Sequence, residues 1–153
     1  AHRMLDGKEY IDSSSGRRIR RWRLEDSDKE SLLYKASHIN HPSAIWARKS
    51  HMNYNWLYSM WTHLCDEYTA RYKKVHLTDS KLRSQLVKPP MCIRIDAFTP
   101  PPPAMPDYCK EPDSITSYRK YYIMEKKRFA KWKNAITPRW FTEENYADLQ
   151  LSL

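Results

Sequence analysis

Three polar side chains recur at four-residue spacing along one stretch of the chain, namely His63, Glu67 and Arg71. Side chains four residues apart share a face of an α-helix, so the three would lie in a row. A histidine next to a carboxylate suits general acid–base catalysis, and we take His63 and Glu67 as candidate catalytic residues. The pair supplies too few ligands for zinc, so no metal site is expected. A Glu67–Arg71 ion pair on a solvated helix face explains the same spacing.

A second group of side chains, His41, Trp46 and Arg48, surrounds an expected helix start at Pro42. Backbone amides at the start of a helix lack partners within the helix, and together with the helix dipole they attract anions. One interpretation is a phosphate held by these amides, His41 and Arg48. The alternative is that His41 caps the turn and Trp46 packs in the core. We take His41 and Arg48 as candidate nucleic-acid-binding residues.

Lysines and arginines alternate with tyrosines in two further runs, one around residue 72 and one around residue 121. A ring flanked by cations can stack on an unpaired base while the cations contact phosphates. Alternatively, the first run complements the negative end of a helix, and the tyrosines of the second run are buried. The candidate nucleic-acid-binding residues of these runs are Arg71, Lys73, Lys74, Arg119, Tyr121, Lys127 and Lys131.

Prolines are concentrated in residues 89–113, which hold 8 of the 10 in the chain. An α-helix is excluded there because proline lacks an amide donor and clashes with the preceding turn. We expect an extended strap of polyproline type that crosses the domain. The strap would form one wall of a pocket, with Asp107 directed inward as a third candidate catalytic residue. A purely structural connection is the alternative.

Net charge and glycine content restrict the classes of function. The 153 residues carry 27 Lys plus Arg against 18 Asp plus Glu, a formal charge of +9. Residues 36–88 hold eight basic against three acidic side chains and residues 114–153 hold eight against four, whereas 89–113 is mildly acidic. This pattern favours a polyanionic partner that releases counterions on binding, although solubility alone also explains it. Only Gly7 and Gly16 occur, so glycine-built nucleotide loops are excluded and no cofactor is expected.

Cysteine content and hydropathy bear on the compartment. The three cysteines are widely spaced and odd in number, which argues against a disulfide framework and for a reducing compartment. No apolar run approaches the roughly 18 residues that a membrane-spanning helix needs, so no membrane partner is expected.

Capping residues and apolar spacing predict the helices that would position these side chains. The expected boundaries are a helix end at Gly7, helix starts at Asn40–Pro42 and at Ser50, and a helix from Thr78 or Asp79 to Leu86. The long helix after Ser50 has a core-facing stripe of Tyr54, Leu57, Trp61, Leu64, Tyr68 and Tyr72.

The second half of the chain predicts one more long helix, which Asp113 or Ser114 caps and which runs to about Lys133. Its apolar stripe is Ile115, Tyr118, Tyr122, Phe129 and Trp132, and Lys120, Lys127 and Lys131 share another face. Thr142, followed by two glutamates, is a suitable start for a last short helix.

Residues 11–31 form an Arg-rich segment that we expect to be a loop. The alternation of Ile19 and Trp22 with arginine also permits an edge strand, and the Arg17–Arg23 run is a candidate surface for a protein partner. Taken together, the patterns predict a mainly α fold, with residues 1–153 as a single compact helical domain and the Pro-rich strap as its crossing loop.

Five blocks, in order along the chain, carry a resemblance to a known family. They are HPSAIWARKSHMNYNWL (41–57), CDEYTARYKKVH (65–76), FTPPPPAMPDYCK (98–110), YRKYYIMEKKRFAKW (118–132) and PRWF (138–141). They resemble a family of tailed-bacteriophage proteins that is common in cyanophages. Relatives generally carry a further N-terminal segment with an Asp-Lys-His motif, so we expect this chain to lack an upstream segment. The spacing of His41, Pro42 and Trp46 is similar, more weakly, to that of small pyrimidine-dimer DNA glycosylase-like proteins.

The resemblance implies a phage-type DNA-binding protein that acts on DNA bases or lesions, with glycosylase or lyase chemistry as one form. Glu67 would then stabilise positive charge that develops on the sugar. The implied location is the cytoplasm of an infected bacterial host or, secondarily, the virion. One alternative is a non-catalytic interaction protein that uses exposed aromatic side chains and basic patches. Another is a small-molecule or nucleotide enzyme with a pocket beside the Pro-rich strap.

Overall fold

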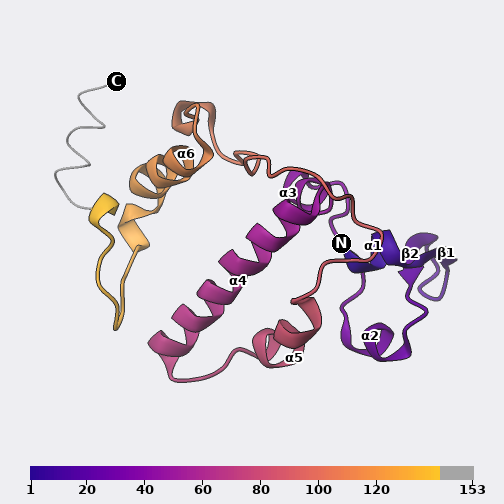
Figure 1. Cartoon of the computed structure of the whole chain (residues 1–153). Coiled ribbons are helices and arrows are strands. Elements are labelled where there is room, and N and C mark those ends of the chain that lie inside the picture. The colour runs from indigo at the N-terminus through magenta and orange to yellow at the C-terminus, as the bar shows by residue number, and fades with distance from the viewer. Residues whose placement is uncertain (142–153) are drawn as a thin grey trace. The chain divides into compact units, whose positions relative to one another are not determined.

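The computed structural model describes residues 1–141 (Figure 1). The contacts of these residues group into two units. Unit 1 contains Ala1–Thr69 and Lys73–Thr99, and unit 2 contains Ala70–Tyr72 and the described chain from Pro100 to Phe141. Six α-helices and one two-stranded sheet occur within the described residues, which confirms the mainly helical fold class. The single compact domain stays a prediction, and each unit is described by itself.

Unit 1 begins with helix α1 (His2–Asp6), which ends at Gly7 as expected. Gly7 has an extended backbone (φ −98°), so it is not a left-handed cap. Its role is steric, because a Cβ atom there would clash with the Arg3 carbonyl oxygen and lie 3.1 Å from the Arg23 carbonyl oxygen. The close approach of two backbone segments therefore requires glycine at this position.

The expected Arg-rich loop at residues 11–31 is wrong, because most of the segment has regular structure. Strands β1 (Lys8–Asp12) and β2 (Ile19–Arg23) pair antiparallel, with Lys8 opposite Arg23 and Asp12 opposite Ile19. Helix α2 (Ser27–Leu32) follows, and the Asp26 carboxylate caps it by accepting from two backbone amides. The edge strand that the sequence permitted is present, although its burial does not alternate strictly: Ile19 and Trp22 are three residues apart and lie on opposite faces, and Trp22 is the buried residue of β2.

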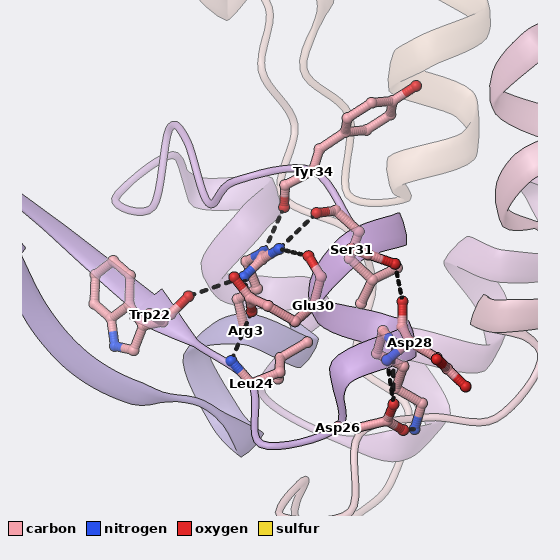
Figure 2. A network of polar contacts seen from close by, with 10 residues as sticks. Arg3, Trp22, Leu24, Asp26, Asp28, Glu30, Ser31 and Tyr34 are labelled. Atoms are coloured by element: carbon pink, nitrogen blue, oxygen red, sulfur yellow. Dashed lines mark hydrogen bonds and ion pairs between the residues drawn. The ribbon is translucent and has the colours of Figure 1, made fainter.

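Arg3 holds these N-terminal elements together (Figure 2). Its side chain is buried, and it donates to the backbone carbonyls of Trp22, Glu30, Leu33 and Tyr34 at 2.6–3.0 Å. It also pairs with the Glu30 carboxylate at 2.5 Å, and the same Glu30 oxygen accepts from the Leu24 amide. One guanidinium has five N–H donors, enough to join α1, β2 and the end of α2.

Three helices complete unit 1, namely α3 (Pro42–Ala47), α4 (His51–Tyr72, whose last turn belongs to unit 2) and α5 (Leu77–Leu86). The Ser50 cap of α4 is confirmed, since its hydroxyl accepts from the Asn53 amide. The expected start of α3 at Pro42 is confirmed, whereas α5 begins at Leu77, one residue before the expected Thr78. His41 caps α3 in place of Asn40, and His76 caps α5 ahead of Thr78. In both, imidazole Nδ1 accepts from the amide two residues on.

The apolar stripe of α4 is buried only along part of its length. Tyr54 is buried, Leu57, Trp61 and Tyr68 are half-buried, and Leu64 and Tyr72 are exposed. The core of unit 1 is small, with Leu24, Leu33 and Leu82 at its centre and Trp61 and Leu86 packed against them. Regular spacing therefore marks a helix correctly, but packing decides which of its residues are buried.

Polar side chains anchor the chain after α5 to α3 and α4. Asn53 is fully buried, donates to the Trp46 carbonyl and the Thr99 hydroxyl, and accepts from the Thr99 amide at 2.8 Å. Trp46 Nε1 donates to the Thr99 carbonyl at 2.7 Å. The expected absence of helix from residues 89–113 is confirmed, apart from a single 3-10 turn at Asp107–Cys109. That the Pro-rich strap crosses a single domain stays a prediction. Its residues up to Thr99 belong to unit 1, and the residues from Pro100 belong to unit 2.

Unit 2 is built around α6 (Ser114–Tyr121), and its Asp113 cap is confirmed. The α-helix ends at Tyr121, continues as a π-helical turn (Tyr122–Lys126) and a 3-10 turn (Lys127–Phe129), and stops short of Lys133.

The buried face of α6 is not the expected apolar stripe. Ile115, Tyr118, Tyr122 and Phe129 are exposed. Ser114 and Ser117 are buried instead, because their hydroxyls donate to the carbonyls of Pro101 and Glu111. Lys120, expected on a solvated face, is buried and pairs with Glu111 at 2.7 Å. The helix therefore packs through polar contacts that a hydrophobicity pattern does not register.

The helix expected after Thr142 lies outside the described residues. Within residues 1–141, no helix combines the length and apolar character needed to cross a bilayer.

Candidate functional site

The main cavity of unit 1, here called the first cavity, has a volume of about 590 Å³. Its lining comes from α1, residues 33–39, α3, the middle of α4 and α5. Leu57, Leu82 and Leu86 give it an apolar wall. Segments from across the first 86 residues of the chain therefore meet at this cavity. Ligand-binding sites in helical proteins often lie between helices in this way.

The first cavity is lined by basic side chains and by the neutral polar groups of Tyr34, Ser37 and Ser43. Among the described residues no aspartate or glutamate lines it, whereas six basic side chains do: His2, Arg3, Lys35, His38, His41 and Arg48. Arg3 is committed to backbone carbonyls, so Lys35 and Arg48 supply the permanent charge. A cavity with apolar walls and basic polar groups suits a ligand that joins a flat apolar ring to an anion.

His41 and Arg48, both candidates from the sequence, lie together here, at the two ends of α3. His41 Nδ1 accepts from the Ser43 amide at 3.2 Å. In the neutral ring the proton must therefore be on Nε2, which is a donor suited to an anionic oxygen. His38, three residues earlier, has a left-handed backbone (φ 49°), and its carbonyl accepts from the His41 amide at 2.9 Å. This turn brings both imidazoles to the cavity.

His2 is a buried and neutral part of the wall. Its Nε2 lies 2.8 Å from the Tyr54 hydroxyl, which itself donates to the Leu86 carbonyl at 2.9 Å. Because the hydroxyl proton goes to Leu86, His2 Nε2 must be the donor. Burial lowers the pKa of His2 to about 4 and raises the pKa of Tyr54. Near neutral pH the ring therefore has an unprotonated Nδ1, which faces the Asp6 carboxylate at 3.8 Å.

None of the three candidate catalytic residues lines the first cavity. His63 is exposed on α4, where its Nδ1 lies 2.7 Å from the Ser59 carbonyl, and Glu67 is half-buried one turn further on. Within the described part of the chain, no three His, Cys, Asp or Glu side chains are arranged to hold a metal ion. Their catalytic roles stay predictions.

Asp107 does not point into a pocket as expected. Its side chain is 95% exposed and pairs with Lys110 at 2.6 Å, and the lysine lowers the pKa of the carboxyl group. The reason is local, because a 3-10 turn places residues 107 and 110 on one side of the chain. The Pro-rich strap likewise contributes no residue to the first cavity.

The other candidate nucleic-acid-binding residues divide between the units. Lys73 and Lys74 are exposed in unit 1 at the end of α4, where Lys73 has a left-handed backbone (φ 55°). Arg71 belongs to unit 2 and donates to the Lys131 carbonyl at 2.9 Å, so part of its donor capacity is structural. Lys127 and Lys131 are exposed in unit 2.

Unit 2 places cations against aromatic rings. Lys126 lies 5.0 Å from the Tyr121 ring, and Arg119 lies 5.8 Å from the Trp140 ring. The ring of Tyr122 is in edge contact with several aromatic neighbours: Trp132, Trp140 and Phe141. Tyr121 and Arg119 are therefore part of a cation–aromatic surface, as their interleaving in the sequence suggested.

Sequence reasoning missed His2, Arg3, Lys35 and His38. For Arg3 no local signal exists, because its partners lie 19 to 31 residues away, and the contact of His2 with the Tyr54 hydroxyl spans 52 residues. His38 had a usable signal, since it stands three residues before His41 in a stretch rich in turn-forming residues.

No protein-family model, curated protein or solved structure matches the chain.

Proposed function

We propose that this protein binds DNA and accommodates an unpaired or displaced base in the first cavity. The observation that carries the proposal is a cavity with apolar walls that the cations Lys35 and Arg48 and the imidazole of His41 line, with no carboxylate among the described lining residues. Its volume of about 590 Å³ lies within the range of roughly 300–1,000 Å³ that ligand pockets occupy. Proteins that read or modify single bases rotate them into pockets of this kind.

The charges around the cavity support a phosphate next to the base. Lys35 and Arg48 remain positive, and His41 offers an Nε2 donor. With no carboxylate in the lining, nothing there repels a phosphodiester. Because phosphate contacts displace condensed counterions, binding of this kind weakens steeply as salt rises.

The cation–aromatic surface of unit 2 supports the same partner. Tyr121 is stacked by Lys126, and the exposed Phe129 ring has both Lys126 and Arg128 nearby. Rings flanked by cations bind single-stranded or unstacked nucleotides with little sequence preference. Lys127 and Lys131 add exposed charge in the same unit.

The resemblance to tailed-phage proteins and to pyrimidine-dimer glycosylase-like proteins points to the same partner, with an infected bacterium as the setting. Base-lesion chemistry is the further hypothesis. His63, Glu67 and Asp107 lie outside the first cavity, so a reaction that used them would take place elsewhere. The alternative of a small-molecule enzyme with a pocket beside the strap stays a prediction, and it would need a pocket other than the first cavity, which residues 89–113 do not line.

The proposal is tested by fluorescence anisotropy titrations with duplex, mismatched and single-stranded oligonucleotides between roughly 50 and 200 mM salt. We expect binding that weakens with salt and is tighter when a base is unpaired. Arg48→Ala should weaken binding. Lys88→Ala is the matched control, because Lys88 is an exposed cation of unit 1 outside the cavity lining. Absence of binding to every oligonucleotide at the lowest salt would refute the proposal.

A protein partner is the second candidate function. Met91 and Ile95 are 85% and 90% exposed on the segment that Asn53 and Trp46 anchor. Apolar side chains exposed on an ordered segment are typical of protein contacts. The expected partner surface at Arg17–Arg23 also stays a prediction, with Arg17 and Arg18 exposed in the hairpin turn. Light scattering would favour this function if the protein forms a stable oligomer that fails to bind DNA.

A further inference from the structure

A second cavity, of about 290 Å³, adjoins the first within unit 1. The two share the lining residues Arg3, Leu33, Tyr34, Lys35 and Ala36. The rest of the second lining comes from β1, β2, α2 and α5, of which the sequence had linked only β2, within the Arg17–Arg23 run, to a partner surface. If part of a ligand occupies the first cavity, the second cavity can therefore hold the chemical group that is attached to it.

The second cavity also carries surplus positive charge. Four cations line it, Arg3, Arg21, Lys35 and Lys81, against one carboxylate, Glu30. Glu30 is already engaged by Arg3 and by the Leu24 amide. The nearest additional carboxylate oxygen to Arg21 and Lys35 belongs to Asp12, at 4.0 and 3.9 Å. Even with Asp12 included, four cations face two carboxylates, so an anion is favoured there.

Arg21 contributes a donor that lacks an acceptor. Its Nη1 donates to the Ala36 carbonyl at 3.2 Å, which fixes the guanidinium against the shared wall. Its Nε is buried, and no hydrogen-bond acceptor lies within reach among the described residues, since Asp12 is too distant. A buried N–H without an acceptor destabilises a protein unless a ligand or water supplies one.

Tyr34 stands between the two cavities. Arg3 Nε holds its backbone carbonyl at 2.8 Å, and Figure 2 shows its ring directed away from the Arg3 network. The ring is 55% exposed, and Lys81 Nζ lies 5.0 Å from its centre. Lys81 is therefore held beside the shared wall, with its charge beside the same recess as Arg21.

We infer that the second cavity binds a phosphate group, with the Arg21 guanidinium donating to an oxygen and Lys81 and Lys35 neutralising its charge. The inference rests on the proposed function in one respect: with DNA bound, this phosphate belongs to the nucleotide adjoining the base in the first cavity. A phosphodiester and a free phosphate present the same oxygens, so the two sources are separated by experiment.

The strand source is tested with oligonucleotides that have an unpaired base and a single neutral methylphosphonate, moved linkage by linkage around that base. Wild-type protein should lose affinity most at one linkage. Lys81→Gln and Arg21→Gln should lose affinity for the unmodified strand but be insensitive to the neutral group at that linkage. Each should also reduce the slope of log affinity against log salt by about 0.7–0.9. Lys88→Gln is the control, and Lys81→Gln remains decisive if the Arg21 variant unfolds.

The free source is tested by calorimetric titration of inorganic phosphate into wild type and both variants. Binding that both variants abolish supports the phosphate site, even if wild type binds no DNA and the proposed function fails. Two results together would overturn the inference and leave the proposed function standing. First, wild type binds DNA, and the methylphosphonate weakens binding equally in wild type and variants. Second, no phosphate binding is found that the variants reduce.

Discussion

The buried guanidinium of Arg3 provides the sharpest test of how the N-terminal part of unit 1 is held. Replacement by methionine keeps most of the volume but removes the contacts to four backbone carbonyls and to the Glu30 carboxylate. The Glu30 carboxylate, 35% exposed, would then lose its cation partner.

The magnitude follows from that loss. Hydrogen bonds that involve a charged group contribute roughly 1.5–3 kcal/mol each, but contacts of one side chain do not add in full. Removing one partner of a buried ion pair costs about 3–5 kcal/mol, and we expect Arg3→Met to fall in this range. For a chain of this size that corresponds to a fall in melting temperature of roughly 6–20 °C. Urea unfolding followed by circular dichroism measures the free energy directly.

Arg20 provides the matched control on the adjoining strand. It also makes two hydrogen bonds to a glutamate, Glu9, at 2.7 and 2.8 Å, but its side chain is 60% exposed. Solvent screens such a pair, so Arg20→Met should leave stability nearly unchanged. Arg3→Lys retains the charge without the planar fork and should recover only a small part of the loss. Equal effects of Arg3→Met and Arg20→Met would refute the reasoning from burial.

Three further perturbations have defined outcomes. The pKa of His2 is depressed to about 4 in the folded protein, against roughly 6.5 in the unfolded chain. The stability that the neutral ring contributes is therefore fully present above pH 6.5 and falls as the pH drops towards 4. His2→Gln should remove this pH dependence from the free energy of unfolding measured by urea titration across that range. Asn53→Ala should destabilise by about 1–3 kcal/mol, because it leaves the Thr99 amide unpaired and leaves the Trp46 carbonyl with the Lys49 amide as its donor. Faster hydrogen exchange at Thr99 would confirm it, whereas unchanged protection there would contradict it. Gly7→Ala should lower the melting temperature through the clash with Arg3, and a neutral or stabilising effect would show that the backbone adjusts.

Local signals in the sequence identified much of the helical framework. Ser50 and Asp113 are caps because their short polar side chains reach amides two or three residues away, a relation contained within one turn. The same reasoning placed the start of α3 at Pro42 correctly but preferred Asn40 as its cap, and it began α5 one residue late, since His41 and His76 cap with an imidazole nitrogen, which is outside the usual capping set. Helix existence was therefore predictable, and exact starts depended on side-chain chemistry that capping statistics under-represent.

Packing and the site were less accessible to sequence reasoning. The stripe on α6 was well spaced, yet Ser114, Ser117 and Lys120 are buried because carbonyls and a carboxylate face them. His41 and Arg48 could be anticipated because six-residue α3 places both beside one hollow. The roles of Arg3 and Lys81 could not be anticipated. Contacts between segments distant in sequence make Arg3 a structural residue and place Lys81 beside a cavity.

Residues 33–36 form the wall that the two cavities share. In this segment the main chain makes the contacts that hold the fold, and the side chains are available for ligand recognition. The carbonyls of Leu33, Tyr34 and Ala36 are held by Arg3 and Arg21, whereas the side chains of Tyr34 and Lys35 are exposed. Because the segment is fixed through its main chain, residues 34 and 35 can change without loosening it. Libraries randomised at these two positions should therefore yield folded proteins with altered ligand preference, which makes this wall the natural place to begin directed evolution.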